Sequence, residues 1–189
     1  MFYDTVAPDI SDSYARMAVT SNANDLTKRS ARGGFWLTNL EKVNIKKATI
    51  EAVERVVPLF DAYRQFYEQP TDPEGARNFL GERLRKSESV ILLAWEGDRC
   101  VGFAQLYPSF SSLSMGRMFI LNDLFVLSSA RGHGVGRALL DQCKRMASEA
   151  GAKELTLETM KNNLTAQHLY EGCGWKRDDV FYKYFLSTS

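Results

Sequence analysis

The chain has 189 residues, of which 44% are apolar and 25% are charged, and its formal net charge is +1. These values are ordinary for a water-soluble globular domain with a full core, and they exclude the broad basic surface that nucleic-acid-binding proteins use. No apolar stretch approaches the roughly 20 residues that span a bilayer, and the first residues lack the pattern of a secretory signal, so we expect no membrane association.

The cysteines and histidines give no sign of a disulfide framework or a metal site. Cys100, Cys143 and Cys173 are widely spaced and odd in number, and His133 and His168 lie far apart. Neither set has the spacing that zinc sites or small disulfide-bonded domains require. We therefore expect a reducing, cytoplasmic setting and no metal cofactor.

The character of the sequence changes near residue 43. Residues 1–42 are polar, rich in Ser, Asn, Asp and Ala, and show no sustained hydrophobic periodicity. We interpret them as an N-terminal extension, which could be a partly ordered arm, an interface element or sequence foreign to the natural protein. Residues 43–189 are predicted to form the functional domain.

From residue 43 onward, alternating apolar residues predict strands, and apolar residues three to four positions apart predict helices. Pro58 is expected to kink the first helix and Pro73 to open the second. Residues 96–99 are expected to turn the first hairpin, and residues 109–116 to form a loop. In chain order, the predicted elements are strand 43–49, helix 50–67, helix 73–86, strand 90–95, strand 100–107, strand 117–127, helix 135–150, strand 153–159, helix 163–172 and strand 180–186.

The stretch NDLFVLSSARGHGVGRALL, residues 122–140, places three alternating glycines between a predicted strand and a predicted helix. Glycines lack the Cβ atoms that would keep an anion away from main-chain N–H groups, and the N-terminus of a helix attracts negative charge. Two flanking arginines add positive charge. The loop is therefore predicted to bind a pyrophosphate through Arg131, Gly132, His133, Gly134, Val135, Gly136 and Arg137.

Two other phosphate-binding motifs fit this loop less well. A P-loop requires Lys followed by Ser or Thr after its last glycine, and neither pair follows Gly136. The dinucleotide fingerprint G-x-G-x-x-G is approximated, and Glu158 lies where a ribose-binding acid would be. Only about 30 residues follow Glu158, however, which is too few to complete a doubly wound sheet. An ordinary glycine-rich turn remains the simpler alternative.

Two segments resemble motifs of one enzyme family. RGHGVG, residues 131–136, resembles the [Q/R]-x-x-G-x-[G/A] coenzyme A motif of the GNAT acetyltransferase superfamily. The resemblance covers about residues 43–186 and is greatest to the small-molecule branch, which includes polyamine and diamino-acid acetyltransferases. The second segment resembles the family pattern N-x-x-A-x-x-L-Y-E-x-x-G-[F/W] through Asn163, Ala166, Leu169, Tyr170, Glu171, Gly174 and Trp175.

The resemblance implies an α/β fold, with a GNAT-type mixed, twisted β-sheet of about six or seven strands flanked by about four helices. It implies an N-acetyltransferase that transfers the acetyl group of acetyl-coenzyme A directly to a small primary amine, such as a polyamine, diamino acid or amino acid. A protein lysine or N-terminus is the alternative acceptor, and a coenzyme A-binding sensor without turnover is the alternative from another class. Because family members are often dimers, we expect a homodimer.

The same resemblance assigns roles to individual residues. The main chain of Leu124, Phe125 and Val126 would pair with the pantetheine arm of coenzyme A, and Asn163 would hydrogen-bond that arm. Tyr170 would donate a proton to the departing thiolate, with a packed helix tyrosine as the structural alternative. The acceptor pocket would draw on acidic and aromatic side chains that suit a cationic amine. These are Tyr63, Tyr67, Glu68, Asp72, Glu74, Tyr107, Ser109 and Phe110.

Asn122 and Asp123 interrupt an otherwise apolar strand, where a polar group needs partners or a purpose. The polyamine enzymes commonly have Glu-Asp at this place, with the Glu implicated in proton acceptance through water. This chain has Asn122 instead, which weakens the prediction of a polyamine and leaves the general base open. Asp123 is the best remaining carboxylate, either as base or as anchor of the amine, and a structural hydrogen-bonding role is equally open.

Overall fold

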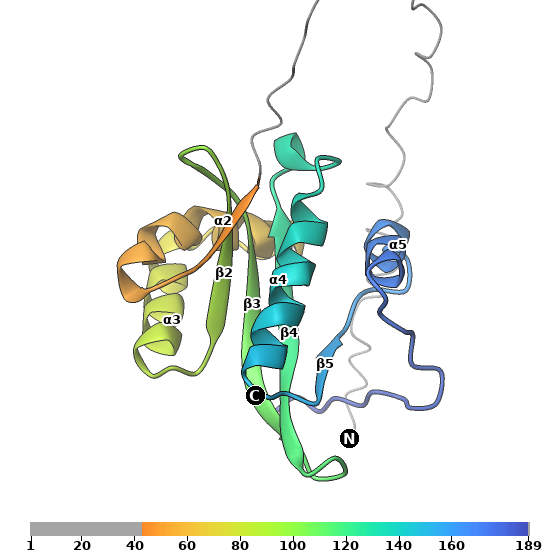
Figure 1. The fold of residues 1–189 in the computed structure, drawn as a ribbon. Coiled ribbons are helices and arrows are strands. Elements are labelled where there is room, and N and C mark those ends of the chain that lie inside the picture. Colours follow the sequence, from red (N-terminus) through yellow and green to blue (C-terminus); the bar gives the residue numbers. More distant parts are fainter. Residues whose placement is uncertain (1–42, 189) are drawn as a thin grey trace, which may run out of the picture. The chain divides into compact units, whose positions relative to one another are not determined.

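The structure is a computed structural model that describes residues 43–188, so the predicted extension over residues 1–42 lies outside the described residues. The described chain contains one five-stranded β-sheet and four α-helices, as Figure 1 shows. In chain order the elements are β1 (Asn44–Lys47), the 3-10 helix η1 (Ile50–Ala52), α2 (Val53–Phe66), α3 (Pro73–Arg85), β2 (Val90–Glu96), β3 (Arg99–Ser111), β4 (Gly116–Val126), the 3-10 helix η2 (Ser128–Ala130), α4 (Val135–Glu149), β5 (Glu154–Leu157) and α5 (Leu164–Gly172).

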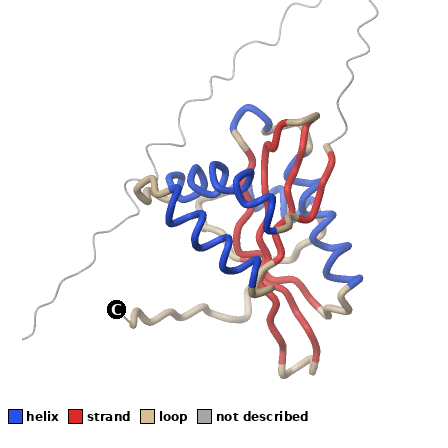
Figure 2. Tube along the Cα trace, turned by 90° about the vertical axis from the view of Figure 1, so that its left-hand side faces the viewer, coloured by secondary structure: helices blue, strands red, loops and turns tan. Residues whose placement is uncertain are grey.

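The sheet has the strand order β1-β2-β3-β4-β5, in which the first three pairings are antiparallel and β4 runs parallel to β5. The mixed α/β fold is therefore confirmed. The longest pairing joins β3 to β4, and Figure 2 shows their hairpin extending beyond the helices that flank the sheet. On its other side β4 is paired only over Met118–Leu121, the residues that face β5.

Helices cover both faces of the sheet, and each face has its own apolar core. Ala104 and Leu106 of β3 face the core beneath α4, whereas Phe103 faces the core beneath α2 and α3. The alternation arises because successive strand residues point to opposite faces. The two long central strands therefore position side chains toward α2 on one face and toward α4 on the other.

The helix boundaries follow local sequence signals. Pro73 is the first residue of α3, and the Asp72 side chain accepts a hydrogen bond from the Gly75 N–H at 2.8 Å, which caps the helix. At the start of α5, Asn163 Oδ1 accepts from the Ala166 N–H at 3.2 Å. Helix α2 runs through Pro58. No helix in the described chain is long and apolar enough to cross a membrane.

Two expectations about strands were wrong. Residues 180–186 form no strand, so the described sheet has five strands rather than six or seven. A strand requires a partner for its backbone hydrogen bonds, and this segment pairs with none of the described strands. Residues 109–111 were expected in a loop but belong to β3, because Ser109 and Phe110 pair with the beginning of β4.

Candidate active site

The glycine loop has an open, left-handed backbone at the start of α4. Gly132 has a φ of 79° and Gly134, the N-cap residue, a φ of 83°. An L side chain is strained at these angles, and a Cβ placed at either glycine would meet nothing within 4 Å. Gly136 has a different role, because its Cβ would lie 3.0 Å from Leu169 Cδ2 on α5. The first two glycines thus keep a space open, and the third lets α5 approach.

The N–H groups at the start of α4 are available to a ligand. The first main-chain hydrogen bond of this helix runs from the Ala138 N–H to the Gly134 carbonyl, and no side chain of the described chain caps this end. The preceding N–H groups, from Val135 to Arg137, therefore point out of the helix beside its positive end. This geometry fits the pyrophosphate of coenzyme A.

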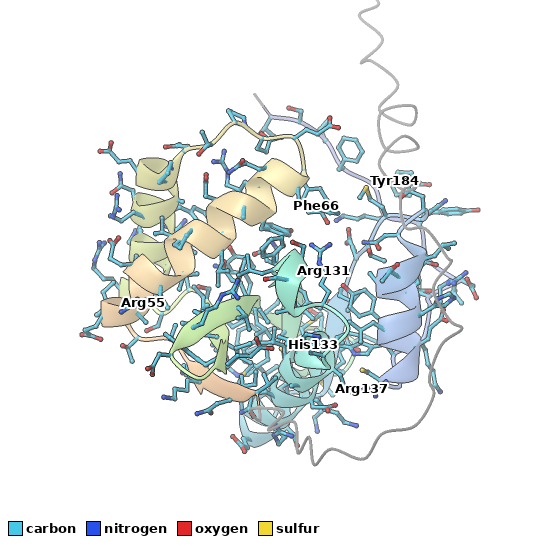
Figure 3. The ribbon with its side chains drawn as sticks, turned by 90° about the horizontal axis from the view of Figure 1, so that it is seen from above. Arg55, Phe66, Arg131, His133, Arg137 and Tyr184 are labelled. Atoms are coloured by element: carbon cyan, nitrogen blue, oxygen red, sulfur yellow. The ribbon has the colours of Figure 1, made fainter. Side chains whose placement is uncertain are left out.

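The two arginines of the loop also fasten it to its neighbours. Arg131 Nε donates to the Val126 carbonyl at 3.0 Å, and Arg137 Nη1 donates to the Gly172 carbonyl at 3.0 Å. The first contact ties the loop to the end of β4, and the second ties α4 to the end of α5. Figure 3 shows both arginines and the exposed His133 grouped around the N-terminal end of α4.

Beyond Leu121, β4 continues without β5 at its side. Opposite β3, Gln105 pairs with Asp123 and Leu106 pairs with Leu121, so Asn122 is the extra residue of a β-bulge. The bulge lies where the pairing of β4 with β5 ends. The segment that was expected to hold the pantetheine arm, Leu124, Phe125 and Val126, therefore lies on the part of β4 that has no described strand on its β5 side.

Asp123 is a buried carboxylate that has no cationic partner among the described residues. It is 5% exposed, and none of the ion pairs found among the described residues involves it. Asn122 Nδ2 donates to Asp123 Oδ1 at 3.1 Å, and the Tyr63 hydroxyl hydrogen-bonds the carboxylate as well. Burial raises the pKa of the Asp123 carboxyl above its ordinary value, while these two hydrogen bonds oppose the rise.

Polar side chains from α2 and β3 surround this carboxylate. Burial, followed by the negative charge of Asp123, raises the pKa of Tyr63 and raises that of Tyr107 to about 12. Gln105 is fully buried; its Nε2 lies 3.1 Å from the Tyr107 hydroxyl, and its Oε1 has no hydrogen-bond partner within residues 43–188. In the sequence, the only signal for Gln105 was its position as a polar residue within the apolar stretch CVGFAQLYP.

Tyr170 lies on α5 among residues that pack toward the core beneath α4. Its ring centroid is 6.2 Å from that of Trp175. Burial, followed by the neighbouring Tyr67, raises the pKa of Tyr170 to about 12. Tyr67 in turn contacts Tyr63, with ring centroids 5.1 Å apart. The structure thus brings together two predicted pocket tyrosines, Tyr63 and Tyr67, and connects them through Tyr63 with Asp123, while the predicted acid Tyr170 interacts electrostatically with Tyr67.

Other residues expected in the acceptor pocket have different positions. The Asp72 carboxylate is the cap of α3, and Phe110 is 72% exposed on the β3–β4 hairpin, where the Arg117 guanidinium lies 5.2 Å from its ring centroid. Asp61 had not been singled out. It accepts hydrogen bonds from the Asp72 N–H and the Thr71 hydroxyl, at 2.8 and 2.7 Å, and so holds the connection between α2 and α3.

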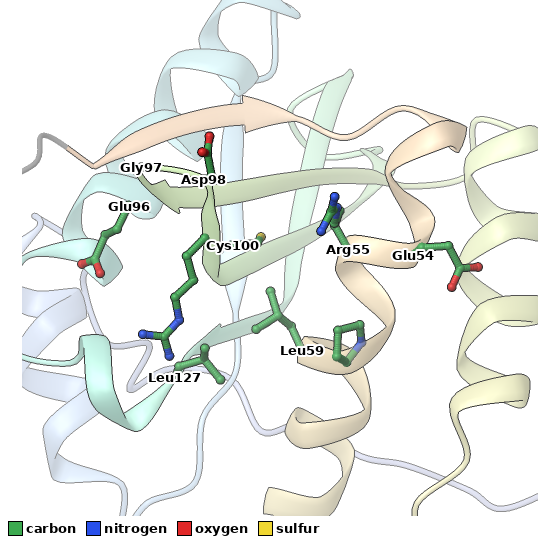
Figure 4. Close-up of a pocket in the computed structure, with 10 residues that line it drawn as sticks. Glu54, Arg55, Leu59, Glu96, Gly97, Asp98, Cys100 and Leu127 are labelled. Atoms are coloured by element: carbon green, nitrogen blue, oxygen red, sulfur yellow. The ribbon is translucent and has the colours of Figure 1, made fainter.

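Figure 4 shows a cavity of about 810 Å³ at another place in the fold. It is lined by the first turns of α2, by the β2–β3 turn and by Leu127, and it includes none of the predicted catalytic or coenzyme A-binding residues. Among the described residues, no group of three or more His, Cys, Asp or Glu side chains could hold a metal ion.

The Acetyltransferase (GNAT) family profile matches residues 56–175 of the chain. The chain belongs to this family. As a GNAT protein it is 48% identical over 146 residues to YhfO of Bacillus subtilis, an uncharacterized N-acetyltransferase, and the overlap covers 77% of this chain and 98% of YhfO. It is 30% identical over 129 residues to the D-amino-acid N-acetyltransferase HPA3 of Saccharomyces cerevisiae, which covers 66% of this chain and 80% of HPA3.

Solved structures agree with the GNAT assignment. The crystal structure of a probable acetyltransferase superimposes with a TM-score of 0.73 at 46% identity, covering 77% of this chain and 98% of that one. An aminoglycoside N-acetyltransferase in complex with CoA superimposes with a TM-score of 0.65 at 18% identity, which supports the fold alone. The protein is therefore an N-acetyltransferase of the GNAT family, a family that uses acetyl-coenzyme A.

Proposed function

We propose that this enzyme acetylates the primary amino group of a small molecule, such as an amino acid, a diamino acid or a polyamine. The observation that carries the proposal is the Asp123 carboxylate, which is 5% exposed and has no described cationic partner. An uncompensated buried charge is costly. A protonated amine would offset that cost and would bring its nitrogen to the bulge of β4.

In this proposal Asp123 accepts the proton that the amine must lose before it can attack the thioester. An alkylammonium has a pKa of about 10.4, so it is protonated at neutral pH. The raised pKa of Asp123 makes this carboxylate a stronger base than an exposed aspartate. Asn122 does not replace the missing glutamate as a base, and it acts instead by donating a hydrogen bond to Asp123.

The donor substrate, acetyl-coenzyme A, supplies an activated acetyl group as a thioester. We assign its pyrophosphate to the N–H groups of residues 132–137 and to the remaining N–H donors of Arg131 and Arg137. The main chain of residues 124–126 would bind the pantetheine arm, and Asn163 Nδ2 would add a hydrogen bond, because its Oδ1 is engaged in capping α5. Tyr170 would protonate the departing sulfur.

The relatives support a small acceptor without deciding its identity. HPA3 is named for D-amino acids, and a bovine relative that is 30% identical over 79 residues is named a thialysine N-epsilon-acetyltransferase. A human N-alpha-acetyltransferase 30 is also similar, at 32% identity over 98 residues, but the overlap covers only 27% of that protein. The depth at which Asp123 is buried favours a slender amine.

The test is thiol release from acetyl-coenzyme A with a panel of amino acids, diamino acids, polyamines, lysine peptides and free N-terminal peptides. We expect turnover with at least one small amine, and we expect Asp123→Asn to lower kcat/KM by about 10²-fold or more. Asp141→Asn, a change at an exposed position of α4, is the matched control. Transfer to peptides alone would contradict a small acceptor, and coenzyme A binding without any transfer would favour a sensor.

A further inference from the structure

Gln105 places an amide oxygen without a partner in the protein interior, opposite Asp123. The side chain is 0% exposed, and its Oε1 has no hydrogen-bond partner within residues 43–188. Gln105 of β3 pairs directly with Asp123 of β4, so both side chains leave the same face of the sheet. The Cβ atoms of residues opposed in this way are about 5 Å apart. Two groups that accept hydrogen bonds are therefore buried one strand apart.

The face that carries this pair is the one beneath α2. The neighbouring pair on the same face is Phe103 and Phe125, and the Tyr63 ring contacts both, at centroid distances of 5.9 and 6.3 Å. The Tyr63 hydroxyl reaches the next pair and hydrogen-bonds Asp123. The apolar core beneath α2 thus becomes polar at Gln105 and Asp123.

One hydrogen bond sets the orientation of the Gln105 amide. Its Nε2 donates to the hydroxyl of Tyr107 at 3.1 Å, and Tyr107 lies two positions further along β3, on the same face. A glutamine that served only to stabilise Asp123 would donate this nitrogen to the carboxylate. Asp123 instead accepts from Asn122 and Tyr63. The nitrogen of the amide is therefore engaged, and its oxygen is left for another donor.

The chemistry of the missing donor follows from its two neighbours. A buried acceptor without a donor destabilises a folded protein, and a buried carboxylate without a cation does so as well. A ligand that relieves both must carry a positive charge and at least two N–H groups. A primary ammonium group carries one charge on a single small atom and has three N–H donors.

We propose that Gln105 Oε1 accepts a hydrogen bond from the ammonium group of the acceptor substrate while Asp123 accepts another, so that the two side chains together select a primary amine. This inference rests on the proposed function. It adds to that function a residue of β3 that determines specificity, and it holds the reacting nitrogen by two acceptors at the bulge of β4.

The burial of the cluster supports selection of an unsubstituted amino group. Asp123 and Gln105 are 5% and 0% exposed, whereas Tyr63 and Tyr107 are half-buried. The two acceptors thus lie one layer of side chains below the surface. A small shift of one tyrosine ring admits a slender amine, and the closed packing leaves no room for further substituents on its nitrogen.

The test uses Gln105→Met, which keeps the length of the side chain and removes its amide, in the full-length enzyme with its best small acceptor. We expect kcat/KM for the amine to fall by about 10-fold or more, because a hydrogen bond to a charged group is lost, while the KM of acetyl-coenzyme A stays within about twofold. Gln142→Met is the matched control, with unchanged kinetics. Gln142 is a half-buried glutamine of α4 that binds Arg145.

Gln105→Glu provides a second measurement. Burial beside Asp123 favours the neutral form of a glutamate, and a carboxylic acid keeps the pattern of the amide, with an O–H for Tyr107 and a C=O for the ligand. Its kcat/KM for the amine should exceed that of Gln105→Met by about threefold or more. A value no higher than that of the methionine variant would contradict the need for an acceptor oxygen.

The remaining outcomes separate this inference from the proposed function. An unchanged kcat/KM in Gln105→Met, or an equal rise in the KM values of both substrates, would overturn the role of Gln105 and leave the proposed function intact. Absence of transfer by the wild-type enzyme to every small amine would instead refute the proposed function.

A third variant tests the inference if Gln105→Met does not fold, as judged by its melting temperature. Tyr107→Phe keeps Gln105 but removes the hydroxyl that engages Nε2, so the amide can turn and donate to Asp123. The KM of the amine should then rise by about threefold or more. An unchanged KM would overturn the inference.

Discussion

At the scale of single residues, the proposed role of Asp123 in binding and catalysis opposes its effect on the stability of the fold. Its carboxylate is buried, and burial raises its pKa, which means that the folded protein holds the charged form less readily than the unfolded chain does. The charged form of this side chain therefore lowers the stability of the folded protein at neutral pH. In a site that binds a cation, the buried charge lowers the stability of the free protein, and binding of the cation offsets that loss.

We therefore expect Asp123→Asn to stabilise the free enzyme while it removes activity. The free energy of unfolding should rise by about 1 kcal/mol at pH 7.5, because the buried charge is gone and a polar group of similar shape remains. Since the folded pKa lies above the unfolded value of 3.8, the contribution of Asp123 to stability is full below 3.8 and is lost as the pH rises through the folded pKa. Urea unfolding at several pH values measures this. A variant less stable than the wild type at pH 7.5 would contradict the expectation.

A substitution at Gly134 can separate an effect on stability from an effect on the binding of acetyl-coenzyme A. Gly134→Ala places a side chain at a φ of 83°, so it should destabilise the protein by about 1 kcal/mol, and its methyl group would enter the proposed phosphate cradle. Gly151 also has a positive φ, 69°, and open space around it, but it follows the other end of α4. We expect both alanine variants to lose comparable stability and only Gly134→Ala to raise the KM of acetyl-coenzyme A, by about 10-fold or more. Equal KM values would place the pyrophosphate elsewhere.

At the scale of elements, the helices were predictable because their signals are local. Apolar periodicity, Pro73 and the Asp72 cap mark their positions without reference to the rest of the chain. Strands depend on partners, so the expected strand over 180–186 is absent, and β3 extends to Ser111 because β4 lies opposite. The glycine loop could be recognised for the same local reason. The contact of Asp123 with Tyr63 joins residues 60 positions apart, and no local pattern predicts it.

The connection from α2 to α3 depends on Asp61, which holds the segment that follows Tyr63 and Tyr67. This carboxylate is 6% exposed and accepts hydrogen bonds from the Asp72 N–H, the Thr71 hydroxyl and Gln65 Nε2. These bonds lower its pKa, so its contribution to stability is present above the unfolded value of 3.8 and is lost as the pH falls through the lower folded value.

Asp61→Asn should therefore lower the free energy of unfolding by about 1–3 kcal/mol at pH 7, because an amide cannot accept all three hydrogen bonds. Urea unfolding measures the loss, and Asp141→Asn, at an exposed position of α4, should change the stability by less than about 0.5 kcal/mol. The difference between the two variants should persist at pH 5, which lies above the unfolded pKa. Equal stabilities would show that the connection does not depend on Asp61.

At the scale of the whole molecule, the end of the described chain presents an unusual surface. Six large apolar or aromatic side chains in this segment are 78–92% exposed: Val180, Phe181, Tyr182, Tyr184, Phe185 and Leu186. Exposed apolar side chains grouped in one segment mark interaction sites. We expect the protein to be a homodimer whose interface includes this segment.

Light scattering after size-exclusion chromatography tests this expectation. The full chain should have the mass of a dimer, and a variant that ends at Arg177 should have the mass of a monomer. Circular dichroism should show an unchanged helix content, because residues 178–188 contain no helix. A full-length protein that remains monomeric at a concentration of about 100 µM would contradict the expected dimer.

The pairing of β4 with β5 ends after Leu121, and this should affect the dynamics of the free enzyme. Amide hydrogens along residues 123–126 that point away from β3 lack a neighbouring strand and should exchange with solvent quickly. A ligand that completes this edge should slow their exchange and leave β2, which has strands on both sides, unaffected. Hydrogen–deuterium exchange with and without coenzyme A measures this. Protection confined to residues 123–126 and the glycine loop would mean that the ligand serves as a missing strand, and unchanged exchange at residues 123–126 would mean that the arm binds elsewhere.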